Sequence, residues 1–197
     1  MAKTKVILVA GHHRMGLYRW PHRSDPGAVP RAYNSTVFYP ALYNEHHECE
    51  KLVTTVATEL NTMGVACHVC PFSYNLQGKI RWINSISSNG LSDILLSVHL
   101  NSVLNPQANG TEVFYFGGDL KSKAKARQLC NSVSDTLCTT NRGEKPDTHS
   151  QHSSLGIIRQ TTPWAFLLEM GFINNKYDME KVRAKGVQAL VNLFKLF

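Results

Sequence analysis

The sequence lacks any apolar run of the roughly 20 residues that a membrane-spanning helix needs. Its first 13 residues have a basic tip and a short apolar run. That run is too short for the core of a secretory signal, and no small-residue cleavage site follows it. We therefore expect no transmembrane segment and no signal peptide, and we interpret the opening run as a first strand of a protein made in a cytoplasm.

Cysteine is too scarce and too irregularly spaced for a disulfide framework. There are five cysteines, an odd number, so free thiols are the expected state. Cys67 and Cys70 have the CxxC spacing of some metal sites, but no second CxxC supplies the other two ligands. On a strand this pair would also point to opposite faces of the sheet, which leaves a metal role as the less favoured reading.

Acidic residues are outnumbered, with 14 Asp and Glu against 21 Lys and Arg and a net charge of +7. This balance favours an anionic partner such as nucleic acid, a membrane surface or a phosphate-bearing wall polymer, although a merely soluble basic protein fits it equally well. No aromatic-basic nucleic-acid motif is present, so we expect no nucleic-acid partner. A non-enzymatic nucleic-acid-binding protein is kept only as a remote alternative.

Internal repeats and linkers are absent, and apolar runs alternate with helical patterns throughout the chain. This alternation predicts one α/β domain, over residues 1–197, with a mostly parallel sheet. We expect strands at 5–10, 65–70, 93–99, 111–116, 155–160 and 165–170, and helices at 45–63, 78–88, 119–138 and 177–196.

Two long polar segments, 11–41 and 139–154, fit neither pattern and are expected to be loops. Structureless loops of this length inside a compact domain usually carry function or form a lid. The first contains the basic and aromatic stretch 13–24, and the second contains His149 and His152, whose roles the sequence leaves open.

Polar residues stand where several of the expected strands end. His12, His99, Arg159 and Glu169 each interrupt or follow an apolar run, and Glu45 opens the first expected helix. Open α/β sheets place their active sites beyond the carboxyl ends of the strands, so these side chains are candidates for one site.

Two imidazoles and one carboxylate form a sufficient ligand set for catalytic zinc, with one position left open. His12, Glu45 and His99 are the candidate ligands. Glu169, in the apolar run AFLLEMGF, is the candidate general base, because a buried carboxylate without a partner is costly. Glu45 also fits a simple first-turn acid, and Glu48 or Glu50 would be the ligand if the helix began later.

Four blocks of the sequence resemble the zinc-dependent N-acetylmuramoyl-L-alanine amidases of bacterial autolysins and phage endolysins. The first is VILVAGHH at 6–13 with SDPGAV at 24–29, similar to the family's Gly-His and Asp-Pro-Gly-Ala motifs. Here the stretch 13–24 separates the two, which leaves the role of Asp25 open. The second block is YNEHHECEKL at 43–52, in which the resemblance favours Glu45 over Glu48.

The third block, LLSVHLNSV at 95–103, is similar to the family's Ser-x-His-x-Asn. The fourth runs from NRGEKP at 141–146 through LGIIRQTTPWAFLLEMGFINN at 155–175. It resembles the family's late block, with an Arg after the fifth strand and a catalytic Glu before Gly-Phe. The resemblance implies His12, Glu45 and His99 as zinc ligands and Glu169 as the catalytic residue, with Arg159 and Asn101 either stabilising the oxyanion or serving as structural bond-makers.

The family further implies a three-layer αβα sandwich around a twisted, mostly parallel sheet of about six strands. The expected activity is cleavage of the amide between N-acetylmuramic acid and L-alanine in peptidoglycan by a zinc-dependent, monomeric hydrolase without a separate wall-binding domain. A zinc peptidase or deacylase acting on another amide is the alternative.

A phage endolysin, made in the bacterial (host) cytoplasm and acting on the wall after release, fits the missing signal; an autolysin freed by lysis fits as well. The basic stretch 13–24 either contacts anionic wall or lipopolysaccharide or is a solvated loop.

Overall fold

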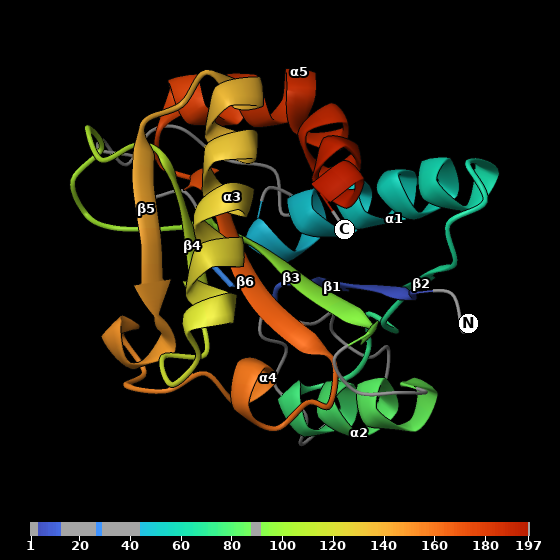
Figure 1. The fold of residues 1–197 in the computed structure, drawn as a ribbon. Coiled ribbons are helices and arrows are strands. Elements are labelled where there is room, and N and C mark those ends of the chain that lie inside the picture. Colours follow the sequence, from blue (N-terminus) through green and yellow to red (C-terminus); the bar gives the residue numbers. More distant parts are fainter. Residues whose placement is uncertain (1–3, 13–26, 29–43, 88–91, 197) are drawn as a thin grey trace, which may run out of the picture.

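The computed structural model describes residues 4–12, 27–28, 44–87 and 92–196. These residues form a six-stranded sheet with five α-helices (Figure 1). The strands are β1 (Val6–Ala10), β2 (Cys67–Val69), β3 (Ile94–Asn101), β4 (Thr111–Tyr115), β5 (Asn141–Pro146) and β6 (Trp164–Phe172). The helices are α1 (Glu45–Thr62), α2 (Leu76–Ile86), α3 (Leu120–Leu137), α4 (Gly156–Arg159) and α5 (Lys176–Leu193). Among the described residues, no helix has the length and apolar character needed to cross a membrane.

The sheet has the strand order β2-β1-β3-β6-β4-β5. Strands β2, β1, β3 and β6 run parallel to one another, whereas β4 pairs antiparallel with β6 and parallel with β5. The prediction of a mostly parallel sheet of about six strands is therefore confirmed. The reversal at β4 brings the amino ends of β4 and β5 to the same edge as the carboxyl ends of β1, β3 and β6.

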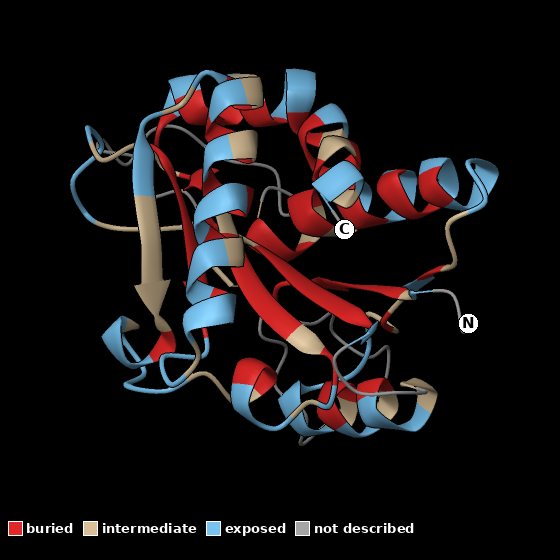
Figure 2. Cartoon of the chain, in the orientation of Figure 1, coloured by how far each residue is buried: buried red, intermediate tan, exposed pale blue. Residues whose placement is uncertain are grey.

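Helices cover both faces of the sheet, which makes the predicted three-layer αβα sandwich (Figure 1). On one face α1, α3 and α5 pack against alternate strand residues such as Leu8, Leu96 and Leu168. On the other face α2 and α4 pack against the intervening residues, among them Leu95 and Leu167. Figure 2 shows the buried residues concentrated on the strands and on the helix sides that face them.

Asparagine and aspartate side chains fix where the long helices begin. Asn44, Asn75, Asp119 and Asn175 each accept hydrogen bonds from first-turn backbone amides of the helix that follows. A capping side chain of this kind replaces one of the missing partners of the first-turn N–H groups. The Asn44 cap makes Glu45 the first residue of α1, and the Asn75 cap starts α2 at Leu76, two residues before the expected position.

The predicted strand at 155–160 is wrong, because residues 156–159 form helix α4. Helical bonds run from the Arg159 amide to the Leu155 carbonyl and from the Gln160 amide to the Gly156 carbonyl, at 3.0 and 2.9 Å. Ile157 and Ile158 are buried under the sheet face that α2 also covers. A short apolar run does not by itself distinguish a buried strand from a buried helical turn.

The loop expected over 139–154 is also partly wrong, because Asn141–Pro146 forms β5 at the edge of the sheet. Its sequence, NRGEKP, has no apolar alternation, as is typical of edge strands that charged residues protect from further pairing. The sixth strand of the sheet is therefore β5 and not the run at 155–160.

The cysteines follow the prediction, since all five are free. Cys67 and Cys70 are buried in different clusters on opposite faces of the sheet. Burial raises the pKa of both thiols to about 12, which keeps them protonated at neutral pH.

Candidate metal and hydrolytic site

A cavity of about 620 Å³ opens where the carboxyl ends of β1, β3 and β6 meet the amino ends of β4 and β5. Because strand side chains alternate between faces, every second residue of β3 and β6 points to the side of α2 and α4. Ser97, His99 and Asn101 reach the cavity in this way, as do Leu167 and Glu169 from β6. The start of α1 contributes Glu45 from the edge.

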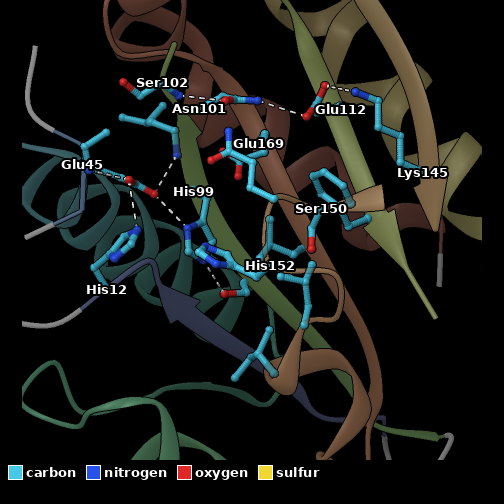
Figure 3. Close-up of a pocket in the computed structure, with 18 of the residues that line it drawn as sticks. His12, Glu45, His99, Asn101, Ser102, Glu112, Lys145, Ser150, His152 and Glu169 are labelled. Carbon is cyan, nitrogen blue, oxygen red and sulfur yellow. Dashed lines mark hydrogen bonds and ion pairs between the residues drawn. The ribbon is translucent and has the colours of Figure 1, made fainter. Parts of the chain in front are cut away.

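Three potential metal ligands meet in this cavity (Figure 3). Glu45 Oε1 lies 2.8 Å from His99 Nδ1, and Glu45 Oε2 lies 3.2 Å from His12 Nε2. The candidate ligand atoms of the three residues all lie within 4.8 Å of one another. Two imidazole nitrogens and a carboxylate at this spacing suit a zinc ion with one open position. The predicted trio is thus brought together.

Backbone geometry explains how the three side chains approach so closely. His12 has φ +58°, a left-handed conformation that is uncommon for a residue other than glycine. A Cβ atom on Gly11 would lie 2.6 Å from His99 Nδ1, and one on Gly27 would overlap His12 and lie 2.5 Å from Glu45 Oε2. Only glycine fits at these two positions beside the ligand trio.

The Glu45 carboxylate is buried and heavily hydrogen-bonded. Besides the two histidines, it accepts bonds from the Ala28 amide at 2.9 Å and the Leu100 amide at 3.3 Å. Burial raises its pKa, but the hydrogen bonds and charges of His12 and His99 outweigh burial and hold the pKa well below its usual range. An ionised carboxylate is the form that binds a cation.

The alternative acids of α1 are engaged elsewhere. Glu48 forms an ion pair with Arg183 of α5, with 3.0 Å between Oε1 and Nη2. Glu50 lies 3.6 Å from the buried His46, whose other ring nitrogen is 2.7 Å from the Gly11 carbonyl oxygen. Neither acid joins His12 and His99.

Lys79, on α2, holds the backbone between Ala10 and His12 in place. Its ammonium group is buried and donates a hydrogen bond to the Ala10 carbonyl at 2.7 Å and another to the His12 carbonyl. A buried ammonium normally has such partners because an unpaired buried charge is costly. Lys79 therefore ties the end of β1 to α2 at the point where His12 leaves the strand.

Glu169 lies directly beside His99, since the two residues are paired in the β3–β6 register. Its Oε2 is buried and has no hydrogen-bond partner among the described residues. Burial raises its pKa well above the usual value, and the nearby charges of Glu45 and Glu112 raise it further, with Lys145 acting in the opposite direction. A protonatable carboxyl of this kind in a cavity is a candidate acid-base group.

Asn101 lines the cavity, but its side chain is bonded within the protein. Its Nδ2 donates to Glu112 Oε1 at 3.0 Å, and its Oδ1 accepts from the Ser102 amide at 2.7 Å. Asn101 thereby links β3 to the buried Glu112 of β4, on the far side of Glu169 from the ligand trio (Figure 3).

Arg159 is not among the residues that line the cavity, and it does not follow a strand. Its guanidinium pairs with the fully buried Asp147, donating from Nε and, at 3.1 Å, from Nη2. Asp147 also accepts bonds from the Gly117 and Leu155 amides. The Arg159–Asp147 pair joins the chain on either side of the segment 148–154. Three residues of that segment line the cavity: His149, Ser150 and His152.

The two outer strands bring charged residues to the cavity that are not among the predicted site residues: Glu112 on β4, and Arg142 and Lys145 on β5. Glu112 Oε2 lies 2.8 Å from Arg142 Nε and 2.6 Å from Lys145 Nζ. A sign of Glu112 was present in the sequence, as a lone charge within the apolar run TEVFYF. The stretch 13–24 and Asp25 lie outside the described residues.

Comparisons with known proteins show which family the chain resembles in sequence and fold. Residues 6–192 match the family model described as N-acetylmuramoyl-L-alanine amidase. The "Probable cell wall amidase LytH" of Staphylococcus saprophyticus is 31% identical over 93 residues, a match that covers 47% of this chain and 29% of that relative. The match therefore spans less than a third of the length of that relative.

Solved structures share the fold over nearly the whole chain. The catalytic domain of CwlV, an N-acetylmuramoyl-L-alanine amidase from Bacillus (Paenibacillus) polymyxa var. colistinus, has a TM-score of 0.71 and 21% identity, with 97% of this chain and 96% of that chain covered. The catalytic domain of the CD27L endolysin targeting Clostridia difficile has a TM-score of 0.67 and 24% identity, with 96% and 93% covered. With the family model matched over residues 6–192, the resemblance read from the four sequence blocks is confirmed, and the chain belongs to the N-acetylmuramoyl-L-alanine amidase family.

Proposed function

We propose that this chain hydrolyses the amide bond between N-acetylmuramic acid and L-alanine in peptidoglycan, using zinc held by His12, Glu45 and His99. The observation that carries the proposal is the meeting of this three-donor set with the Glu169 carboxyl in one cavity. The family match supports the substrate, and the donor set supports the metal.

Each residue has a role that its surroundings allow. A zinc ion at the trio supplies Lewis acidity toward the amide carbonyl and makes a water molecule more acidic. Glu169 accepts the proton of the attacking water and then donates it to the departing alanine nitrogen. Its raised pKa is compatible with this role, because the carboxyl holds a proton more strongly than an ordinary glutamate does.

Asn101 and Arg159 are proposed to orient the site. Asn101 holds Glu112 against the cavity wall through its 3.0 Å bond, and Arg159 holds Asp147 and with it the wall segment 148–154. Both roles are compatible with the engagement of these side chains inside the protein.

The net charge of +7 supports a further part of the proposal, contact with anionic wall polymers. A phage endolysin that reaches the wall after its release from the host cytoplasm fits this picture. The structural likeness to an endolysin catalytic domain supports that assignment.

The decisive experiment compares the wild type with Glu169→Gln on purified peptidoglycan. We expect zinc content to be unchanged while release of peptides with a new N-terminal alanine falls by at least 100-fold, since general acid–base groups contribute about 10²–10⁴-fold. Glu59→Gln, at an exposed position of α1, is the matched control and should retain activity.

Retained hydrolysis in Glu169→Gln would remove the proposed base. Mass spectrometry of the wild-type digest separates the alternative: a product other than a peptide beginning with alanine would identify a peptidase or deacylase that cuts another amide.

A further inference from the structure

An irregularity in β5 places two cations on the same side of the sheet. Arg142 and Lys145 are three residues apart, so a regular strand would direct them to opposite faces. The β4–β5 register shifts, with Thr111 opposite Asn141 but Val113 opposite Glu144. Gly143 takes φ +81° at this point. This bulge turns both cations toward Glu112 and the cavity, whereas Glu144 pairs with Arg127 of α3.

Glu112 holds both cations but can neutralise only one of them. Its buried carboxylate lies 2.8 Å from Arg142 Nε and 2.6 Å from Lys145 Nζ. Arg142 also donates from Nη1 to the Asn109 carbonyl at 3.3 Å. The three side chains together carry one positive charge, and each cation keeps N–H donors beyond those bonded to Glu112 and Asn109.

The surroundings hold these cations in place on the cavity wall. The Arg142 guanidinium lies 5.0 Å from the centre of the Phe172 ring, and Lys145 Nζ lies 6.0 Å from that of Phe114. Both rings line the cavity. The side chains of Arg142 and Lys145 remain 35% and 31% exposed, so an anion in the cavity can reach them. Fixed cations with an apolar backing bind an anion more strongly than solvated ones.

A further polar group of the cavity wall is the Ser150 hydroxyl. Ser150 Oγ is buried and forms no hydrogen bond among the described residues. A buried hydroxyl without a partner is costly unless a ligand or water completes it. Figure 3 shows Ser150 and Lys145 on the side of Glu169 that is away from His12 and Glu45.

We propose that Arg142 and Lys145, anchored by Glu112, form a subsite for a free carboxylate of the peptide, next to the amide that is cut. This inference rests on the proposed function and names the part of the substrate that the far wall recognises. A guanidinium presents parallel donors that match a carboxylate, and the neighbouring ammonium adds charge. With the scissile amide at the ligand trio, a wall beyond Glu169 is reached by the next residue of the peptide.

The test uses two muramoyl dipeptides that differ in one group, a free α-carboxylate or an α-carboxamide on the second residue. We expect wild-type kcat/KM to be about tenfold higher for the free carboxylate, as one charge-assisted bond provides. In Lys145→Gln this ratio should fall toward one, and in Arg142→Lys, which keeps the charge but loses the fork, it should fall partly. Arg127→Gln is the matched control, since it breaks the pair with Glu144 on the other side of β5.

A binding measurement makes the test independent of catalysis. Calorimetry with the Glu169→Gln protein and the corresponding free dipeptides should show the same preference for the carboxylate, and Lys145→Gln in that background should abolish it. A wild type that does not discriminate in binding would overturn the subsite, whether or not the amide is cut. The subsite would also be overturned if Lys145→Gln cut both muramoyl dipeptides more slowly by the same factor and left the kcat/KM ratio unchanged. That result would assign the cations to the chemical step.

Failure of the proposed function has a different signature. In that case the zinc-loaded wild type cuts neither muramoyl dipeptide, while the binding preference for the carboxylate is still present and still lost in Lys145→Gln.

Discussion

At the scale of single residues, the position of His12 depends on Lys79, which is not itself one of the three candidate ligands. Lys79 donates to the carbonyls of Ala10 and His12 and thereby fixes the backbone at which β1 ends. Groups that orient metal ligands in this way typically change metal affinity by 10–100-fold when removed. If His12 is a zinc ligand as proposed, Lys79 positions it.

We predict that Lys79→Met weakens zinc binding by about tenfold and lowers the free energy of unfolding by about 1–3 kcal/mol, because the carbonyl of His12 loses its ammonium donor. Competition with a zinc chelator measures the first effect and urea denaturation the second. Arg81→Met, at an exposed position on the same helix, is the control and should change neither. Unaltered zinc affinity in Lys79→Met would show that His12 is positioned by other contacts.

A second residue-scale prediction concerns acid stability. Burial raises the pKa of Asp147, but the bonds from Arg159 and from the Gly117 and Leu155 amides outweigh burial and hold the pKa below its ordinary value of 3.8. The carboxylate therefore stabilises the fold in full above pH 3.8, and this contribution is lost as the pH falls further, through the lower folded-state pKa.

We expect Asp147→Asn to lower the free energy of unfolding by about 2 kcal/mol at neutral pH, and the difference from wild type to shrink below about pH 4. Urea denaturation over a pH series measures this. Asp135→Asn, at an exposed position of α3, should cost less than about 0.5 kcal/mol at neutral pH. A difference that persists undiminished in acid would mean that packing, and not the Asp147 charge, holds the segment 148–154.

At the scale of elements, the direction of β4 decides which site residues the sequence can reveal. Searching for polar residues at the carboxyl ends of strands finds His12, His99 and Glu169, because β1, β3 and β6 are parallel. β4 runs the other way, so its contribution, Glu112, lies near its amino end. The direction of a strand depends on its tertiary pairing and cannot be predicted from local periodicity. A search of the carboxyl ends of strands therefore misses Glu112.

Two further elements show what local patterns do and do not determine. Helix α1 was predictable within a residue at each end, because a capping asparagine precedes a long amphipathic pattern and Gly64 follows it. The run at 155–160 was too short for its periodicity to separate strand from helix. The edge strand β5 has no apolar alternation, so the sequence gives no local sign of it.

A prediction at the scale of elements concerns Gly143, at the bulge of β5. With φ +81° and no atom within 4 Å of an added Cβ, Gly143→Ala should cost about 1 kcal/mol from backbone conformation alone. Gly64 has φ +80° and equally open space at the end of α1, so Gly64→Ala should cost the same.

Only Gly143→Ala, however, should reduce the preference for the substrate with the free carboxylate, because the bulge at Gly143 directs Arg142 and Lys145 toward Glu112. Thermal unfolding compares the stabilities of the two variants, and the kcat/KM ratio of the two muramoyl dipeptides compares their sites. An equal loss of preference in both variants would trace the effect to general destabilisation.

At the scale of the whole molecule, the net charge of +7 acts over distances that single contacts do not. Peptidoglycan in intact walls is accompanied by anionic polymers, and a cationic enzyme is concentrated beside them. Salt screens this attraction, since the Debye length falls from about 10 Å at 0.1 M to about 3 Å at 1 M. Electrostatic interactions inside the cavity are screened less, because the charged groups there are partly removed from water.

We therefore predict that raising the salt concentration from 0.1 to 1 M slows lysis of whole walls severalfold more than cleavage of a soluble muropeptide. The soluble substrate should carry the carboxamide, so that salt acting at Arg142 and Lys145 does not enter the comparison. Turbidity of wall suspensions and chromatography of the muropeptide products measure the two rates. If salt slowed both equally, the charge would act on the catalytic step or on stability, and attraction to the wall would not explain it.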